Sequence, residues 1–522
     1  MTLESAGYVT DVTYIPGFYP QLAPTAIRHI AALNRVVPPS LEKGFRYVEL
    51  GCGLGRALTT LGAVHPRGEF IGVDINPSHT SQATREAEAG AVANARFVTA
   101  DFAHLPDDIR DADFITLHGV WSWVAPEVRA DILRIARERL APGGLLLVSY
   151  NAMPGWAHLL PIRGILRQYA ALRKGDTAQR AREAVDYLAF QRDHQAKYFI
   201  DNPGASKYVD TMRELDPRYL AHEYLNEHWT SFYFTEVAAQ FASAGLTFTG
   251  SLPVHMNFWD LCVPPSFQEL FRTTTDRLVT EAHKDFCANT MFRWDLFAKD
   301  PRPLPDAAAR IRAVDDLHYR VARPGIKLPY SVNLGIVTST VTGEPYDTLL
   351  EILAGPGLRL SQIVADPRFA QAPPDDVVRA LDAGVAMRLF DVNAAPQAAM
   401  PAGSTLAHPR MPSAFNRSML VSELFSGRGT PLASPLTGSA ITLGDFDAAI
   451  LSELVTGGRD RLAERIVALM ESRQRVLNHE GKPVTDPAER LRRVEEGCAA
   501  FSETILPALF EQGIVDHGPA GA

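Results

Sequence analysis

Short runs of apolar residues alternate with helix-compatible stretches over the first 150 residues of the chain. Five of these runs read as strands, at 47–50, 70–73, 95–100, 113–117 and 145–149. The stretches between them are compatible with helices at 56–63, 78–89 and 126–140. Strands that are apolar at every position are typical of a parallel sheet covered on both faces. The pattern therefore predicts a doubly wound, Rossmann-like α/β sheet within residues 1–160.

The pattern changes after residue 160. Residues 161–300 are mostly helix-compatible, and an apolar run at 245–253 predicts a sixth strand, which makes the preceding helical segment an insertion into the sheet. A seventh strand is expected at 255–264, so that residues 245–264 would complete the sheet. The remainder, 266–300, is expected to be helical.

Two further regions follow linkers rich in proline. Residues 306–395 combine three short helices with a strand at 388–392, which predicts a winged-helix shape. The segment 375–382 is acidic, so contact with protein is favoured over contact with DNA. Residues 413–516 are expected to be mostly helical.

The most informative motif is the turn that follows the first predicted strand. Its glycines form a G-x-G-x-G pattern, Gly51, Gly53 and Gly55, and Glu49 lies two residues before the first of them. Glycines in a turn between a strand and a helix bring the backbone close to a nucleotide-like ligand. A carboxylate at position 49 would repel a pyrophosphate, but it suits the cationic amino-acid end of S-adenosylmethionine. The motif therefore favours this sulfonium nucleoside over a dinucleotide.

Acidic residues also follow the second and third predicted strands. Asp74 comes 25 residues after Glu49, the spacing expected of a carboxylate that binds ribose hydroxyls. Asp101 and Phe102 are expected beside the adenine. The full set of predicted cofactor-binding residues is Glu49, Gly51, Cys52, Gly53, Gly55, Asp74, Ile75, Asp101, Phe102 and His118.

Several blocks in the first 300 residues are similar to a known family. They lie at 8–14, 17–24, 49–55, 72–79, 118–124, 149–156 and 219–224. In these blocks the chain resembles bacterial class I S-adenosylmethionine methyltransferases with a methyltransferase regulatory domain, a group that includes rickettsial outer-membrane-protein lysine methyltransferases. At residues 293–295 it has Arg-Trp-Asp where relatives tend to have Arg-Arg-Asp. The resemblance implies methyl transfer to an acceptor amine, with protein lysine as the preferred acceptor and an envelope protein as a candidate substrate.

The residues after the fourth predicted strand are expected to face the acceptor, because ligands bind at the carboxyl ends of such strands. They lack the Asn-Pro-Pro-Tyr sequence of amide- and adenine-methylating relatives, and Trp121 and Trp123 suit an aliphatic amine instead. Tyr14, Tyr150 and Asn151 are further candidates for the catalytic site, and no residue stands out as a general base. Two alternatives stay open: a small-molecule methyltransferase, and a regulatory protein that binds S-adenosylmethionine without turnover.

Composition narrows the choice of partners. The 522 residues carry a net charge of −9, and no basic stripe that would bind nucleic acid is visible. No run of 18 apolar residues occurs, so we expect no membrane insertion. The four cysteines have no spacing typical of a metal site, so no metal is expected. The first residues lack the features of a secretory signal, which favours the cytoplasm, and a homodimer is compatible with the sequence.

Overall fold

The computed structural model describes residues 17–323, 325–397, 406, 408–479 and 482–517. Its centre is a seven-stranded sheet with the strand order β3-β2-β1-β4-β5-β7-β6. The strands are β1 (Phe45–Leu50), β2 (Gly68–Asp74), β3 (Ala95–Thr99), β4 (Ala112–Leu117), β5 (Leu140–Asn151), β6 (Leu246–Leu252) and β7 (Phe292–Lys299). Among these strands, β7 runs in the direction opposite to that of the other six. The predicted doubly wound α/β sheet is confirmed.

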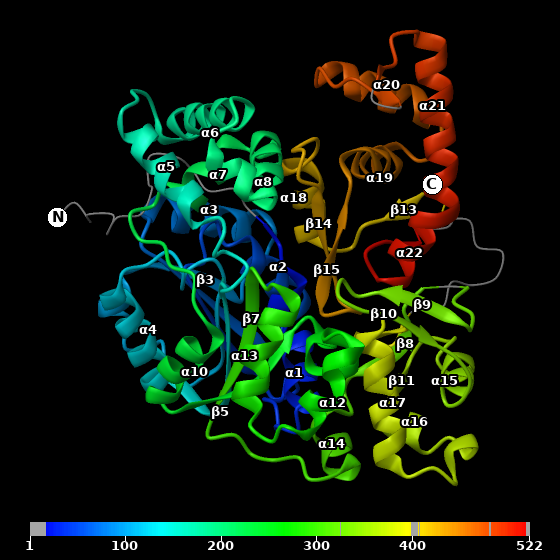
Figure 1. Cartoon of the computed structure of the whole chain (residues 1–522). Coiled ribbons are helices and arrows are strands. Elements are labelled where there is room, and N and C mark those ends of the chain that lie inside the picture. Colours follow the sequence, from blue (N-terminus) through cyan, green and yellow to red (C-terminus); the bar gives the residue numbers. More distant parts are fainter. Residues whose placement is uncertain (1–16, 324, 398–405, 407, 480–481, 518–522) are drawn as a thin grey trace.

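Helices cover both faces of the sheet (Figure 1). They are α1 (Pro24–Leu33), α2 (Arg56–Val64), α3 (Pro77–Ala89), α4 (Pro126–Arg139) and α10 (Phe234–Ser243). On one face, apolar residues of α1 and α2 pack against strand residues such as Tyr47. On the other face, α4 and α10 pack in the cluster that contains Val48. Consecutive strand residues point to opposite faces, so a strand buried on both sides is apolar at nearly every position.

The seventh strand is not where the sequence predicts it. Residues 255–264 instead contain parts of a short 3-10 helix (Val254–Asn257) and α11 (Trp259–Cys262). Two longer helices follow, α12 (Pro265–Thr273) and α13 (Arg277–Ala288). The chain then enters the sheet as β7, in a stretch for which the sequence favours helix throughout.

Strand β7 escapes prediction because it carries buried charges. The guanidinium of Arg293 donates hydrogen bonds to Asp295 at 2.8 Å, Asp285 at 2.7 Å and Glu281 at 3.0 Å. Asp285 and Glu281 lie on α13. Burial of Arg293 is tolerated because this helix supplies partners of opposite charge. A local hydrophobic pattern contains no trace of that pairing.

The helical insertion lies between β5 and α10 and packs around an apolar core of its own. Its helices are α5 (Leu160–Ala171), α6 (Thr177–Asp193), α7 (Lys197–Asp201), α8 (Pro203–Glu214) and α9 (Pro217–Tyr224). Figure 1 shows α5 to α8 together at the top of the view, beyond one end of the sheet. Helices therefore occur where the sequence predicts them, and β6 lies within the predicted strand at 245–253.

Residues 306–395 form a unit whose apolar core also includes Ala32 of α1 and Leu261 of α11. Its helices and strands are α14 (Ala307–Val314), β8 (His318–Val321), β9 (Tyr330–Asn333), β10 (Thr338–Val341), α15 (Tyr346–Ile352), β11 (Leu358–Arg359), α16 (Leu360–Val364), a 3-10 turn (Pro367–Phe369), α17 (Pro374–Ala386) and β12 (Phe390–Asn393). Strands β11, β8 and β12 pair in a small sheet, and β9 and β10 form a hairpin. The three expected helices are present, and the winged-helix shape stays a prediction.

The C-terminal module, residues 413–516, is mostly helical, with two short antiparallel strand pairs, β14–β15 and β16–β17, that the sequence does not reveal. It contains α18 (Ala414–Ser422), β14 (Thr430–Ser434), β15 (Ser439–Leu443), α19 (Asp445–Gly457), α20 (Leu462–Ser472), β16 (Asn478–His479), β17 (Lys482–Pro483), α21 (Pro487–Ala500), a π-helical turn (Phe501–Ile505) and α22 (Leu506–Glu511). Strand β13 (Pro409–Arg410), just before the module, pairs with β18 (Asp516–His517). The β14–β15 hairpin packs on α2, and Figure 1 shows the two side by side.

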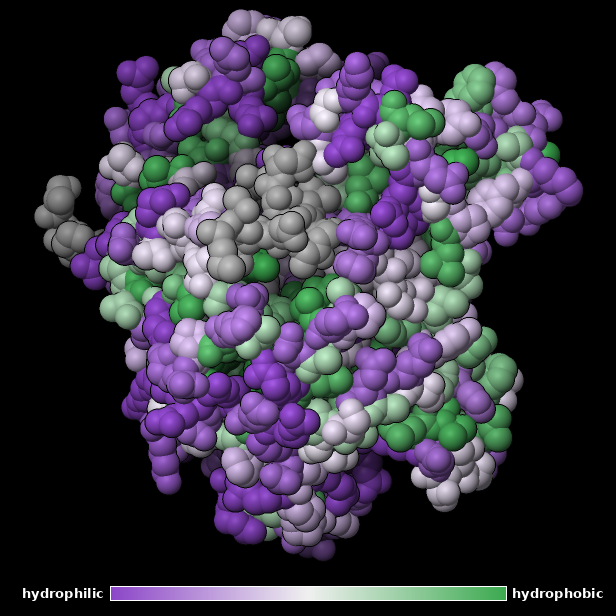
Figure 2. Space-filling model, turned by 90° about the vertical axis from the view of Figure 1, so that its left-hand side faces the viewer, coloured by the Kyte–Doolittle hydropathy of each residue, from purple (hydrophilic) through white to green (hydrophobic). Residues whose placement is uncertain are grey.

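Hydrophilic residues dominate the face shown in Figure 2, where hydrophobic residues gather in small separate patches. None of the described helices combines the length and the apolar character that a membrane span requires. Within the described ranges, no group of His, Cys, Asp and Glu side chains is arranged to hold a metal ion.

Candidate active site

The glycine turn after β1 has the left-handed backbone that its sequence suggests. Gly51, Gly53 and Gly55 have φ angles of 75°, 53° and 71°. A Cβ on Gly51 would lie 2.5 Å from Val120, and one on Gly55 would lie 2.5 Å from Phe97. A Cβ on Gly53 would have no neighbour within 4 Å. The outer glycines are therefore required by packing, and the middle one borders open space in which a ligand can approach the backbone.

Asp74, at the end of β2, holds this turn in place. Its carboxylate accepts hydrogen bonds from the backbone N–H of Gly53 at 2.8 Å and from that of Asn76 at 2.9 Å. The ring Nδ1 of His79 lies 3.3 Å from the same carboxylate. The predicted ribose-binding residue is thus fixed beside the middle glycine, which brings two parts of the predicted cofactor site together.

Glu49 carries a buried, unpaired oxygen at this edge of the sheet. Its side chain is buried, with the residue 6% exposed, and its Oε2 has no hydrogen-bond partner among the residues that the structure describes. Burial and the nearby negative charge of Asp74 raise the pKa of the Glu49 carboxyl to about 8. An ammonium group beside it would satisfy the oxygen and favour the ionised form. The residues present therefore fit the cationic amino-acid end of S-adenosylmethionine.

The other predicted cofactor residues lie at the carboxyl ends of neighbouring strands. Ile75 directly follows β2, and Asp101 begins a short 3-10 helix (Phe102–His104) after β3, where its carboxylate accepts the His104 N–H at 2.8 Å. Phe102 packs against the core of the sheet. The side chain of Cys52 also points into the core, and burial raises the pKa of its thiol. Cys52 therefore contributes its backbone to the turn, and its sulfur is not a reactive thiolate.

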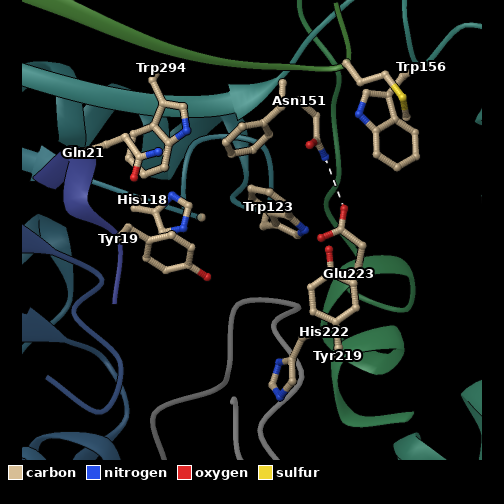
Figure 3. A pocket seen from close by; sticks show the side chains of 13 residues that line it. Tyr19, Gln21, His118, Trp123, Asn151, Trp156, Tyr219, His222, Glu223 and Trp294 are labelled. Atoms are coloured by element: carbon tan, nitrogen blue, oxygen red, sulfur yellow. Dashed lines mark hydrogen bonds between the residues drawn. The ribbon is translucent and has the colours of Figure 1, made fainter. Parts of the chain in front are cut away.

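A cavity of about 410 Å³ lies beside the turn, at the end of β4 (Figure 3). Five separate segments line it, with the residues Tyr19, Gln21, His118, Gly119, Trp123, Asn151, Trp156, Tyr219, His222, Glu223, Met291, Phe292 and Trp294. Val120, one residue beyond Gly119, touches Gly51 of the turn. The cavity and the cofactor turn are therefore neighbours, as a donor and an acceptor site must be.

His118, predicted to bind the cofactor, forms one wall of this cavity, and its contact with the cofactor stays a prediction. Its ring stacks on Trp294 with centroids 4.4 Å apart and lies 4.0 Å from the ring of Tyr19. Its Nδ1 is 2.7 Å from the Ser149 hydroxyl. Burial lowers the pKa of His118 to about 3, so the imidazole is neutral at physiological pH. The aromatic stack gives this side of the cavity a rigid, apolar surface.

Glu223 supplies the carboxylate at the opposite side. It lies on α9 of the insertion, is 8% exposed, and accepts a hydrogen bond of 3.4 Å from the Asn151 side chain at the end of β5. Figure 3 shows this carboxylate facing Asn151 and the ring of Trp123. Burial raises the pKa of Glu223 to about 7, against the lowering effect of the Asn151 hydrogen bond. A carboxylate with this pKa can gain or lose a proton at physiological pH.

Comparison with known proteins agrees with this geometry. The profile of the family "Methyltransferase domain" matches residues 48–144, and that of the "Predicted methyltransferase regulatory domain" matches residues 216–299. The uncharacterized protein sll1526 of Synechocystis sp. (strain ATCC 27184 / PCC 6803 / Kazusa) is 30% identical over 515 residues, which are 97% of this chain and 99% of that protein.

The chain belongs to the class I methyltransferases that carry a methyltransferase regulatory domain. It is an S-adenosylmethionine-dependent enzyme, as the sequence predicts. The methyltransferase is also 24% identical over 288 residues to the uncharacterized protein RP789 of Rickettsia prowazekii, covering 55% of this chain and 51% of that one. PKMT2 from Rickettsia typhi, solved in complex with AdoHcy, shares its fold with a TM-score of 0.71 at 20% identity, covering 96% of this chain and 99% of that one.

Two of the predicted catalytic residues of the methyltransferase do not reach the cavity. Trp121 is 0% exposed and packs in the core, with its ring 4.9 Å from that of Phe241. The Tyr150 hydroxyl donates a 2.5 Å hydrogen bond to buried Asp295. Neighbouring strand residues point to opposite faces, so Asn151 lines the cavity and Tyr150 does not. The direct acceptor contacts expected of Trp121 and Tyr150 are therefore corrected to roles in packing.

The remaining predictions for the acceptor site have separate outcomes. Trp123 and Asn151 line the cavity as expected, and their catalytic roles stay predictions. Tyr14 lies outside the described residues.

Several cavity residues were not predicted from the sequence. Glu223 and Tyr219 come from the 219–224 block, and Tyr19 from the 17–24 block, which carry the family resemblance. These two blocks could have pointed to the cavity residues. They contain polar and aromatic residues outside the sheet core, where packing of the sheet does not require them. Trp294, at the position where relatives tend to have arginine, gave a second signal.

Proposed function

We propose that this methyltransferase methylates the side-chain amine of lysine in a protein. The observation that carries the proposal is the pairing of a buried carboxylate, Glu223, with aromatic rings around one cavity. Aromatic faces attract an alkylammonium group, both as the lysine substrate and as the methylated product. The carboxylate adds a charge of opposite sign, so the cavity favours an amine over a hydroxyl, a thiol or a planar ring nitrogen.

The same residues can prepare the amine for reaction. Lysine enters as an ammonium and has to lose a proton before its nitrogen can attack, and desolvation between aromatic rings lowers its pKa. Glu223 can accept that proton while Asn151 holds the carboxylate in position. The neutral ring of His118 and the indole of Trp294 limit the space available to the amine and exclude water.

The cofactor side of the site has a different task. S-adenosylmethionine, when bound, supplies a methyl group activated by attachment to a positively charged sulfur. Glu49 would hold its ammonium end, and Asp74 with the backbone of Gly53 would hold the nucleoside next to the cavity. Catalysis then rests mainly on positioning the amine and on its desolvation.

A protein acceptor is favoured by three lines of support. The sequence blocks resemble rickettsial protein lysine methyltransferases, and PKMT2 from Rickettsia typhi has the same fold over nearly the whole chain. The cavity is lined by the insertion and by the regulatory region, and both lie outside the minimal parallel sheet. This resemblance suggests an envelope protein as the candidate substrate, which the enzyme would methylate in the cytoplasm before the protein is exported.

The decisive experiment is methyl transfer from radiolabelled S-adenosylmethionine to two fractions of a bacterial extract, total protein and small molecules. We expect label in protein, and mass spectrometry should locate it on lysine as increments of one methyl group. Protein whose lysines have been acetylated serves as the matched control and should take up no label. Label only in the small-molecule fraction would support a small-molecule methyltransferase. Cofactor binding without label in either fraction would support a regulatory protein. Gel filtration of the purified enzyme tests whether it forms a homodimer.

A further inference from the structure

The residue directly after the glycine turn is bound by the C-terminal module. Arg56 begins α2, is 6% exposed, and donates from Nε to Glu86 on α3 at 2.6 Å. Its Nη2 donates to Glu423 at 2.8 Å. Glu423 follows α18, 367 residues later in the chain, and is also buried. One guanidinium thus joins both helices that follow the cofactor strands to a distant carboxylate.

Glu423 is itself held in place. Its second oxygen accepts a hydrogen bond of 3.0 Å from Arg428, in the segment that leads to β14. Burial raises the pKa of Glu423, but the hydrogen bonds and charges of Arg56 and Arg428 outweigh this effect, and its pKa lies below the usual value. The carboxylate is therefore ionised at physiological pH, and a buried pair of opposite charges results.

The contact around this ion pair is apolar and extensive. Phe415 and Met419 of α18 pack in one cluster with Ala87 of α3 and Val92. At the C-terminal end of α2, the ring Nε2 of His65 lies 2.9 Å from the carbonyl oxygen of Gly438, between β14 and β15. The module is thus fixed to α2 and α3 at several points, and Glu423 occupies the one nearest to the turn.

The ion pair also borders the segment that leads into the acceptor cavity. A second cavity of about 230 Å³ is lined by Arg56 and Glu423 together with Phe18 and Tyr19. Tyr19 lines the acceptor cavity as well, where its ring lies 4.0 Å from His118. Tyr19 therefore lies between the two cavities, and a shift of Arg56 would change the surroundings of Tyr19.

We propose that Glu423 is a positioning residue for cofactor binding. Through Arg56 it keeps the start of α2, and with it Gly55, in the conformation in which the turn accepts S-adenosylmethionine. Without this carboxylate, Arg56 keeps its two hydrogen bonds to Glu86, at 2.6 and 3.0 Å, but loses its link to the C-terminal module, and removing one partner from a buried ionic network is unfavourable. The guanidinium would move toward solvent and displace the turn. The C-terminal module thereby sets the affinity for the cofactor, although none of its described residues lines the acceptor cavity.

The test compares Glu423→Gln with the matched variant Glu471→Gln in the full chain. Glu471 pairs with Arg490 on the surface of the same module, far along the chain from the turn. Binding of S-adenosylhomocysteine is measured by calorimetry. We expect Glu423→Gln to weaken it about five- to tenfold, the range of a modest coupling between sites, and Glu471→Gln to leave it within twofold. In turnover assays the KM for S-adenosylmethionine should rise with little change in kcat. Unchanged affinity in a folded Glu423→Gln protein would overturn the proposal.

A second measurement needs no variant and therefore cannot fail through misfolding. Coupling between sites is reciprocal, so cofactor binding must stabilise the contact of the module with α2. Hydrogen–deuterium exchange of the natural chain, with and without S-adenosylhomocysteine, should show protection at 51–64 and also at 414–434. Protection confined to the first segment contradicts the proposal. Both experiments use the cofactor product alone, so they do not depend on the identity of the acceptor.

Discussion

The two halves of the active site each contain one buried glutamate, and the two residues reach their positions in different ways. Glu49 lies on β1, two residues before the glycine turn, and its pKa is raised to about 8 by burial and by Asp74. Glu223 lies on a helix of the insertion, and burial raises its pKa to about 7. Glu49 has an oxygen without a partner, whereas Glu223 already has Asn151.

This difference matches the two tasks. A carboxylate with an unsatisfied oxygen next to a second acid is suited to bind an ammonium group. The ammonium donates a hydrogen bond to the unpaired oxygen, and its charge offsets the repulsion between the two acids. A carboxylate with a supporting amide and a pKa near neutrality is suited to exchange a proton. We therefore expect the half around Glu49 to bind the cofactor and the half around Glu223 to perform the proton transfer.

Removing the carboxylate of Glu223 should give the largest effect. Glu223→Gln keeps the shape and the contact with Asn151 but cannot accept a proton, so we expect kcat to fall about 100- to 10,000-fold. Cofactor affinity, measured by calorimetry, should stay unchanged. Glu227→Gln, at an exposed position four residues along the chain, is the matched control and should retain activity.

The pH profile sharpens this result. The ionised carboxylate is the active form, so kcat/KM of the natural enzyme should fall about tenfold per pH unit below pH 7, where Glu223 becomes protonated. Glu223→Gln should lack this limb. A variant that kept both the rate and the limb would remove Glu223 from proton transfer and erase the contrast between the two glutamates.

A substitution of the middle glycine of the turn should weaken cofactor binding. Gly53 has a φ of 53° and borders open space, so Gly53→Val introduces strain and fills the approach to the turn without a clash in the core. We expect binding of S-adenosylhomocysteine to weaken by roughly 100-fold, about 3 kcal/mol. Gly143→Val is the matched control, because Gly143 also has a positive φ and no neighbour around its Cβ position. Equal affinity in both variants would place the cofactor elsewhere.

Substitutions of the two tryptophans after β4 test which of them lies in the acceptor site. Trp123 lines the cavity, so Trp123→Ala should raise the KM for the acceptor about tenfold, the loss of one cation–π contact of ~1.4 kcal/mol. Trp121 lies in the core, so Trp121→Ala should instead lower the free energy of unfolding by about 3–5 kcal/mol. Denaturant unfolding and steady-state kinetics on both variants separate the two effects. A raised KM for the acceptor in Trp121→Ala, with unchanged stability, would place Trp121 in the acceptor site instead.

The smallest effect is a proton released on cofactor binding. With a pKa of about 8, the Glu49 carboxyl is mostly protonated at pH 7, and an ammonium bound beside it favours ionisation. We expect release of about one proton per S-adenosylhomocysteine at pH 7, measured by calorimetry in two buffers of different ionisation enthalpy. Glu49→Gln should abolish the release. Release that persisted in this variant would show that another group ionises.

The sequence by itself determined the cofactor half. Apolar runs with two-sided burial define β1 to β5, and left-handed glycines define the turn, because both depend only on residues that are adjacent in the chain. Asp74 could be predicted for the same reason, since a repeating strand–helix unit fixes the spacing between consecutive strand ends. Glu49, Gly53 and Asp74 accordingly lie together in the structure.

Tertiary structure decided most of the acceptor half, although Trp123 and Asn151 were predicted from the sequence. Tyr19, His118, Asn151, Glu223 and Trp294 come from segments that only the packed fold brings around one cavity. Two of these segments depend on long-range pairing of polar groups. Strand β7 carries Trp294, and its buried Arg293 is paired with carboxylates of α13 and with Asp295 of the same strand. Glu223 is placed by the packing of the insertion. Such pairings leave no periodic signal, because a charged residue looks the same in sequence whether its partner is a protein side chain or water.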